Sequence, residues 1–295
     1  MNEHALRFGD NGNLIGIYTA TSRPATRPGI VLVNSGVIHR TGPNRLYVNI
    51  ARQLAAAGYP VLRFDLSAIG DSSPRSDALS FEKSAISETS AAMAALGTHS
   101  GATGFILCGI CSGADIAFLT ARDNPAVVGA VLINGRGLHS VTDNSGDDGI
   151  ETHASTLGSD ASARYLLKSA LFNPKSWRKL ISGQVNYLEL LRLLGGELLR
   201  PMAPRESRPD SAPALHAAFH QVLGRGTALL MVYSEGDLAL DYMKLMFGKE
   251  IKKFAAYANF GEVHLPGADH TFTPRHSRDE LIATLRNWAD ARFTH

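Results

Sequence analysis

A cysteine between two glycines is the residue of this sequence with the clearest chemical potential. Gly109, Cys111 and Gly113 form a GxCxG pattern that follows a buried-strand pattern over 105–108 and leads directly into a helix pattern. This spacing is typical of a sharp strand-to-helix turn that exposes a nucleophile, because the residues two before and two after the central one must be small. A thiolate on such a turn attacks carbonyl carbon, so the pattern indicates acyl chemistry.

Ser112, next to that cysteine, is the competing nucleophile. With Ser112 at the centre of the turn, the flanking positions would be Ile110 and Ala114, and a branched residue at the first is sterically poor. The partial positive charge at the N-terminus of the following helix also favours the thiolate of Cys111. We therefore predict that Cys111 is the nucleophile and that the Ser112 N–H donates to a developing oxyanion.

The two cysteines also form a CxxC pattern, which occurs in redox and zinc sites. A zinc site needs about four ligands, and the sequence has no second cysteine pair. A redox pair stays open as an alternative, although the glycine-flanked turn would bury Cys108 at the end of its strand. We expect no metal and no cofactor.

A nucleophilic cysteine needs a base, and position in the chain decides among eleven histidines. His270 lies in a loop after the last strand pattern and before the final helix pattern. This is the expected place of the base, which comes last in chain order. The other histidines considered are interpreted as surface or core residues: His39, His139, His216, His220, His264 and His276.

The acid that orients the base should follow the penultimate strand pattern, residues 228–234. Asp237, just beyond that strand, is the candidate. Glu235 competes with it, Asp241 is a weaker alternative, and an acid at this place can also merely cap a helix. The resulting chain order of nucleophile, acid and base agrees with that of a nucleophile elbow.

A second oxyanion donor is expected in the loop after the strand pattern over 30–34. Gly36 lets the backbone approach a substrate closely, and the Val37 N–H follows it. Further along, His39 and Arg40 are candidate ligands for a carboxylate or phosphate of the substrate. The predicted substrate-binding residues are therefore Gly36, His39 and Arg40.

Alternating strand and helix patterns must position these residues. Leu46, Ile50 and Leu54 place an apolar stripe on a helix that ends at Gly58. Such alternation predicts an α/β fold with a mostly parallel sheet between two layers of helices. The predicted strands cover 14–19, 30–34, 61–65, 105–108, 127–134, 228–234 and 262–265, and the further helices lie near 85–96, 114–122, 214–223, 242–254 and 279–291.

The strand patterns stop between residues 135 and 213, a length far beyond an ordinary connection. We predict a core formed by 1–134 and 214–295, and a helical cap or lid inserted at 135–213. Residues 161–208 contain nine Lys and Arg and three acidic residues, a net charge of +6. The rest of the chain therefore carries a net charge of −4. A solvated helical face is the commoner origin of such a run, and a basic rim that attracts an anionic substrate or partner is the alternative.

Composition excludes several broad classes of protein. With 295 residues, 44% of them hydrophobic, the chain can bury a sizeable core, and two cysteines cannot form a disulfide framework. A net charge of +2 gives no overall basic field, so we expect no nucleic-acid partner. The sequence shows no secretory signal and no run of about 18 apolar residues, so we expect a cytoplasmic protein without a membrane span.

These residues together resemble the α/β-hydrolase superfamily, here with a cysteine nucleophile. The resemblance runs from Gly36 to His270. More narrowly, the segments 40–47 and 63–72 and the GxCSGA elbow resemble the exosortase-system-associated hydrolases, and 173–177 fits the cap of that group. Ala68 stands where the related loop usually has glycine. Dienelactone hydrolases also use a cysteine but have a more compact form.

The resemblance implies the α/β-hydrolase fold, with a mostly parallel eight-stranded sheet flanked by helices and an inserted helical lid. The residues predict an acyl hydrolase of the thioesterase type that forms an acyl-cysteine from a thioester or ester. The small-molecule acyl substrate would be carried by an acyl carrier protein or coenzyme A, with ordinary esters and lactones next. An acyltransferase to an amine or alcohol, and a non-catalytic ligand-binding protein, are the alternatives.

Overall fold

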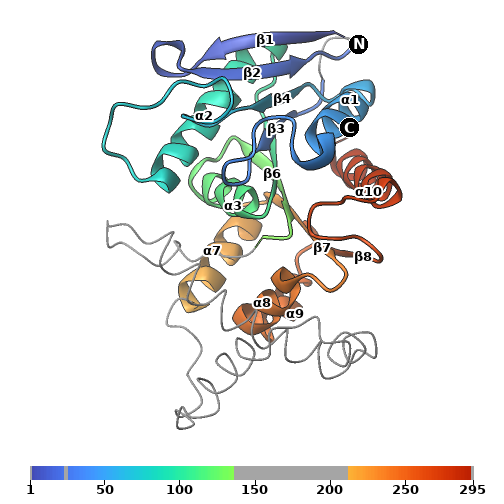
Figure 1. The fold of residues 1–295 in the computed structure, drawn as a ribbon. Helices are drawn as coiled ribbons and strands as arrows, with labels where there is room; N and C mark the ends of the chain where they lie inside the picture. Colours follow the sequence, from blue (N-terminus) through green and yellow to red (C-terminus); the bar gives the residue numbers. More distant parts are fainter. Residues whose placement is uncertain (1, 23–25, 136–211, 294–295) are drawn as a thin grey trace, which may run out of the picture. The chain divides into compact units, whose positions relative to one another are not determined.

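A single twisted sheet forms the centre of the computed structural model, which describes residues 2–22, 26–135 and 212–293 (Figure 1). In these residues eight strands lie in the order β1-β2-β4-β3-β5-β6-β7-β8. Strand β2 pairs antiparallel with β1 and β4, and all other pairs are parallel, which confirms the predicted fold class. The strands are β1 Glu3–Phe8, β2 Leu14–Thr19, β3 Gly29–Val33, β4 Val61–Phe64, β5 Phe105–Ile110, β6 Val127–Ile133, β7 Ala228–Ser234 and β8 Phe260–Leu265.

Helices cover both faces of this sheet because alternate strand residues point to opposite sides. Val31 and Val33 of β3 belong to one apolar cluster, and Ile30 and Leu32 belong to the other. The first cluster includes side chains of α2, α3 and α7 to α9, and the second those of α1 and α10 (Figure 1). The helices are α1 Leu46–Ala56, α2 Phe81–Ser100, α3 Ser112–Asp123, α7 Ala212–Gly224, α8 Leu238–Phe247, α9 Glu250–Phe254 and α10 Arg275–Phe293, with 3₁₀ turns at Asp10–Gly12 and Pro43–Arg45.

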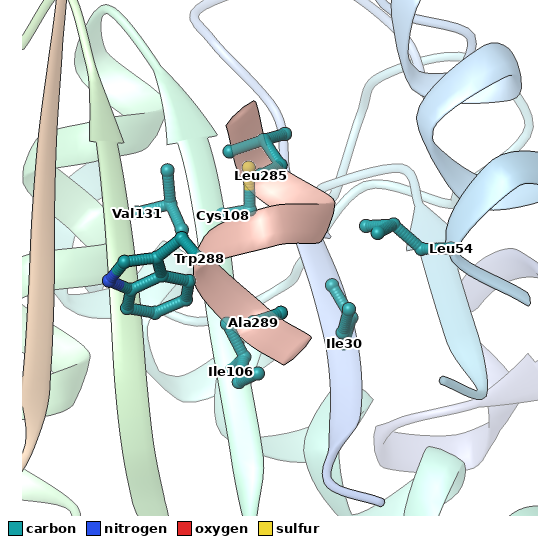
Figure 2. A pocket seen from close by; sticks show the side chains of 8 residues that line it. All are labelled: Ile30, Leu54, Ile106, Cys108, Val131, Leu285, Trp288 and Ala289. Atoms are coloured by element: carbon teal, nitrogen blue, oxygen red, sulfur yellow. The ribbon is translucent and has the colours of Figure 1, made fainter. Parts of the chain in front are cut away.

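Cys108 belongs to the packed core between the sheet, α1 and α10. Figure 2 shows its side chain close to Leu285 of α10. The side chains around it leave a cavity of about 10 Å³ with an almost entirely apolar lining, which has room for one water at most. Its lining residues are Ile30, Leu54, Ile106, Cys108, Val131, Leu285, Trp288 and Ala289. Cys108 therefore has a packing role.

Three predictions about the strands and helices were wrong. The single helix predicted near 242–254 is two helices, because Gly248 adopts a φ of 50° and ends α8 before α9 begins. Strand β5 extends to Ile110, so Cys108 lies inside it and does not end it. Strand β1 was missing from the predicted strands, because Glu3–Phe8 is a partly exposed edge strand without a β-branched run.

The predicted cap, residues 135–213, lies outside the described residues except for positions 135, 212 and 213. Its boundaries therefore stay a prediction. By its contacts the chain divides into two units, Met1–Gly146 with Ser211–His295 and Asp147–Asp210, and the described residues belong to the first. Within the described ranges, no helix is long and apolar enough to span a membrane.

Candidate active site

Cys111 occupies a strained turn between β5 and α3. Its φ of 56° and ψ of −127° are unusual for a residue with a side chain, and it is the N-cap residue of α3. A Cβ on Gly109 would collide with the backbone of Gly113, and a Cβ on Gly113 would lie 2.5 Å from the Val33 carbonyl oxygen. The turn thus needs both glycines, because strand, helix and the end of β3 meet there without room for side chains.

The two cysteines differ in exposure. Cys111 is partly exposed, whereas Cys108 is 2% exposed. Burial raises the pKa of the Cys108 thiol to about 12, so this thiol stays protonated at neutral pH. Cys108 is therefore an inert core residue, and only Cys111 of the two is accessible to a substrate.

His270 and Asp237 form a short hydrogen bond at the same end of the sheet. The His270 Nδ1 lies 2.6 Å from Asp237 Oδ2, and the Asp237 side chain is 4% exposed. The other carboxylate oxygen, Oδ1, accepts a 2.8 Å hydrogen bond from the Ala239 N–H as the N-cap of α8. Asp237 therefore orients the imidazole and also caps a helix, which fixes the carboxylate in place.

The competing acid, Glu235, has another contact. It accepts a 3.0 Å hydrogen bond from the Gly267 N–H and so links the end of β7 to the loop after β8. The side chain of Asp241 lies outside the described residues. Of the described candidates, Asp237 is the one bonded to His270.

His270 also has a side-chain hydrogen bond with Cys111. The hydrogen bond with Asp237, followed by the one with Cys111, raises the pKa of His270 to about 9 despite its partial burial. The imidazole is therefore protonated at neutral pH, which electrostatically favours a thiolate beside it. Cys111, Asp237 and His270 follow β5, β7 and β8, so the sheet brings them together at the carboxyl ends of parallel strands.

The predicted oxyanion loop follows β3 and is tied to the elbow by Ser112. The Ser112 Oγ accepts a 3.0 Å hydrogen bond from the Gly36 N–H and lies 3.4 Å from the Ser35 Oγ. Gly36 has a φ of 50°, and the Val37 side chain is 86% exposed. The Ser112 hydroxyl thus holds the loop. The backbone N–H of Ser112 is the first of α3, and the first N–H groups of a helix have no acceptor within the helix.

Arg40 has a different environment from the one expected. Its guanidinium forms ion pairs with the buried Asp65 and the exposed Asp71, and the Arg40 backbone N–H donates to Asp65 Oδ1 at 2.6 Å. Two carboxylates therefore neutralise its charge, which disfavours the predicted binding of a substrate anion. The other predicted ligand, His39, is exposed and contacts Thr41.

Tyr47 joins the two strands that lead into the site and was not among the predicted residues. The buried Tyr47 hydroxyl donates to the Val33 carbonyl at 2.7 Å and accepts from the Ile110 N–H at 3.2 Å. Burial raises the pKa of this hydroxyl well above its ordinary value, so it remains a donor. It bridges β3 and β5 directly before the oxyanion loop and the elbow. A tyrosine on an apolar helix stripe gives no sequence signal for this role.

Comparison with solved structures finds the same fold at low sequence identity. An esterase from Pyrococcus furiosus superposes with a TM-score of 0.60 at 12% identity, over 100% of this chain and 91% of the esterase. The α/β hydrolase GrgF from a Penicillium species gives 0.57 at 14% identity over 100% of both chains. A dienelactone hydrolase from Anabaena variabilis gives 0.52 at 14% identity, over 99% of this chain and 98% of that one.

Sequence comparison assigns the family. A search of the curated proteins finds no match. Residues 30–284, which include the elbow, Asp237 and His270, match the profile described as the alpha/beta hydrolase family. The chain belongs to the alpha/beta hydrolase family.

Proposed function

We propose that this hydrolase cleaves thioesters or esters through an acyl-cysteine on Cys111. The observation that carries the proposal is the set of hydrogen bonds made by His270, which joins the Asp237 carboxylate on one side and the Cys111 thiol on the other. A cysteine at the elbow beside an oriented, protonated imidazole is the arrangement that nucleophilic acyl chemistry needs.

The reaction begins with attack of the Cys111 sulfur on the carbonyl carbon. A carbon–sulfur bond forms, the carbonyl oxygen becomes an oxyanion, and the Val37 and Ser112 N–H groups donate to it. The bond to the leaving group then breaks as the His270 imidazolium gives that group a proton. Neutral His270 next takes a proton from water, whose oxygen attacks the acyl-cysteine and releases the acid.

Acyl transfer is the alternative fate of the same intermediate. An acyl-cysteine is a thioester and keeps more transfer potential than an acyl-serine, so an amine or alcohol could replace water. Mass analysis of the products with and without such an acceptor separates the two: transfer yields an amide or ester, and hydrolysis yields the free acid in both cases.

The proposed substrate is an acyl chain on an anionic carrier, either a phosphopantetheine-bearing protein or coenzyme A. The net charge of +6 over 161–208 supports attraction of an anion, and the leucines at 188, 190, 191, 194 and 198 support an apolar acyl chain. Ordinary esters and lactones are the next candidates. We further propose that the protein belongs to the exosortase-system-associated hydrolases, because segments 40–47 and 63–72 resemble that group.

Intact-protein mass spectrometry after incubation with acyl thioesters tests the mechanism. We expect wild type to gain the mass of one acyl group, and Cys111→Ala to gain none and to lose turnover. Cys108→Ala is the matched control, and we expect it to be acylated like wild type. Cys111→Ser tests whether sulfur is required.

Two results would contradict the proposal. Full turnover by a folded Cys111→Ala variant would exclude this nucleophile. A folded wild type without any adduct at neutral pH, toward thioesters and a thiol-reactive acyl probe, would instead favour a ligand-binding protein. Equal activity on carrier-bound thioesters and on a neutral ester of the same acyl group would exclude the carrier while leaving the mechanism intact.

A further inference from the structure

Asn134, directly after β6, has an unusual combination of burial and backbone conformation. It is 0% exposed and has a φ of 47°, in the left-handed region that is uncommon for residues with a side chain. Asparagine tolerates this region better than most residues do, because its short polar side chain can bond locally. A buried polar residue keeps a strained backbone conformation only where the contacts around it hold it there. The hydrogen-bond partners of Asn134 therefore indicate its role.

The Asn134 side chain uses both amide donors and its carbonyl oxygen. The Nδ2 donates to the Ser234 Oγ at 2.8 Å and to the His270 carbonyl oxygen at 3.0 Å. The Oδ1 accepts from the Ser234 N–H at 2.9 Å. Because a backbone N–H can only donate, this last bond also fixes which amide atom is oxygen.

Ser234, the last residue of β7, extends the same network to the next peptide. Its Oγ donates to the Asp269 carbonyl oxygen at 2.8 Å and accepts the hydrogen bond from the Asn134 Nδ2. The carbonyls of Asp269 and His270 are therefore both held by side chains at the ends of β6 and β7. We define Asn134 and Ser234 as the carbonyl clamp.

The clamp acts on a turn that also carries strain of its own. Phe272 has a φ of 55°, and its N–H donates to the Asp269 carbonyl at 3.1 Å. The Asp269 Oδ1 accepts from the Thr273 N–H at 2.8 Å. These bonds lie within the turn. Among the hydrogen bonds described for this part of the chain, only those of the clamp connect the Asp269 and His270 carbonyls to the ends of β6 and β7.

We propose that Asn134, together with Ser234, is a positioning residue for His270. By fixing the peptides on both sides of the His270 Cα, the clamp keeps the imidazole within reach of Asp237 and Cys111 at once. The inference rests on the proposed function, in which His270 is the base. Misplacement of a reacting group by about 1 Å costs up to about 100-fold in rate, so a backbone clamp of this kind matters for activity.

Three substitutions separate the clamp from a general effect on folding. Asn134→Gly keeps a residue suited to positive φ and removes both donors. Asn134→Asp keeps an acceptor for the Ser234 N–H but sets an oxygen against the His270 carbonyl. Asn259→Ala is the matched control, because the Asn259 Nδ2 likewise bridges two carbonyls, those of Leu223 and Thr227, before the start of β8 and away from the site.

The readout is the pH profile of Cys111 alkylation by iodoacetamide, followed by intact mass, alongside thermal unfolding. We expect Asn134→Gly and Asn134→Asp to alkylate up to about 30-fold more slowly at pH 7, which is the thiolate deficit of an ordinary cysteine with a pKa of about 8.5. Their rates should converge with that of wild type near pH 10. Asn259→Ala should unfold at a lower temperature but keep the wild-type profile.

A folded Asn134→Gly variant with the wild-type profile would overturn the proposal. If Asn134→Gly does not fold, Ser234→Ala and Asn134→Asp decide in the same way. The proposed function fails separately: a His270→Ala variant with the wild-type profile would show that His270 does not pair with Cys111, whatever the Asn134 variants do.

Discussion

At the scale of single residues, the proton on His270 links the two halves of the proposed reaction. Asp237 and Cys111 raise the pKa of the imidazole to about 9, so it is charged below that pH and loses its proton above it. An alcohol is a poor leaving group and needs this proton, whereas a thiolate leaves without it. The substrate therefore determines how much the titration of His270 matters.

We predict that kcat/KM for an ester falls as the pH rises through about 9, while kcat/KM for a thioester with the same acyl group falls much less. The ratio kcat/KM is the right quantity because it reports on the free enzyme and the acylation step. Asp237→Asn removes the largest cause of the raised pKa, so the decline in ester activity should move to lower pH. Parallel profiles for the two substrates would contradict the role of His270 as proton donor to the leaving group.

At the scale of elements, the elbow depends on the absence of a side chain at Gly109. An added Cβ would meet the backbone of Gly113 in α3, and neither β5 nor α3 can move without disturbing the packed core around them. We predict that Gly109→Ala lowers the free energy of unfolding by about 3 kcal/mol and abolishes acylation of Cys111.

Gly224, at the end of α7, is the matched control for that substitution. A Cβ there meets nothing within 4 Å, and the residue has no positive φ. Gly224→Ala should leave acylation unchanged and stabilise the protein by up to about 1 kcal/mol in chemical unfolding. Equal stability of the two variants would show that the glycine contact at the elbow does not constrain the fold.

The loop after β4 provides an independent test of backbone strain. Ala68 has a φ of 63° and an exposed side chain, at the position where the sequence resemblance led us to expect glycine. A left-handed alanine costs about 1 kcal/mol or more, part of which is offset because glycine gains freedom in the unfolded chain. We predict that Ala68→Gly stabilises the protein by about 0.5 to 1 kcal/mol in urea unfolding. Destabilisation would mean that the alanine side chain makes a contact that outweighs the strain.

At the scale of the whole molecule, the sheet explains which features could be predicted from the sequence. Cys111, Asp237 and His270 each follow a strand pattern, and the carboxyl ends of parallel strands meet at one edge, so their proximity was predictable. The roles of Tyr47 and Asn134 were not. Asn134 contacts a residue 136 positions away, and local periodicity carries no information about such a pair. The predicted oxyanion donors and the cap boundaries remain predictions.

The distribution of charge along the chain leads to the last prediction. The chain leaves the carboxyl end of β6 at residue 135, at the edge of the sheet where Cys111 lies, and returns at α7. Between these points it carries the net charge of +6 over 161–208, against −4 elsewhere. If the substrate is the proposed anionic carrier, this charge attracts it to the enzyme, and such attraction weakens as salt shortens the screening length.

We predict that kcat/KM for an acyl-carrier or coenzyme A thioester falls at least about 10-fold between ~0.05 and ~0.5 M NaCl, across which the screening length falls from roughly 14 to 4 Å. A neutral thioester with the same acyl group should change little. Lys179→Glu should lower kcat/KM for the anionic substrate alone. Lys252→Glu makes the same charge change on the exposed face of α9, before the start of β8, and should have no such effect. If both variants lowered kcat/KM alike, net charge and not the basic segment would control binding. If both substrates lost activity alike with salt, attraction of the anionic carrier would not contribute to binding.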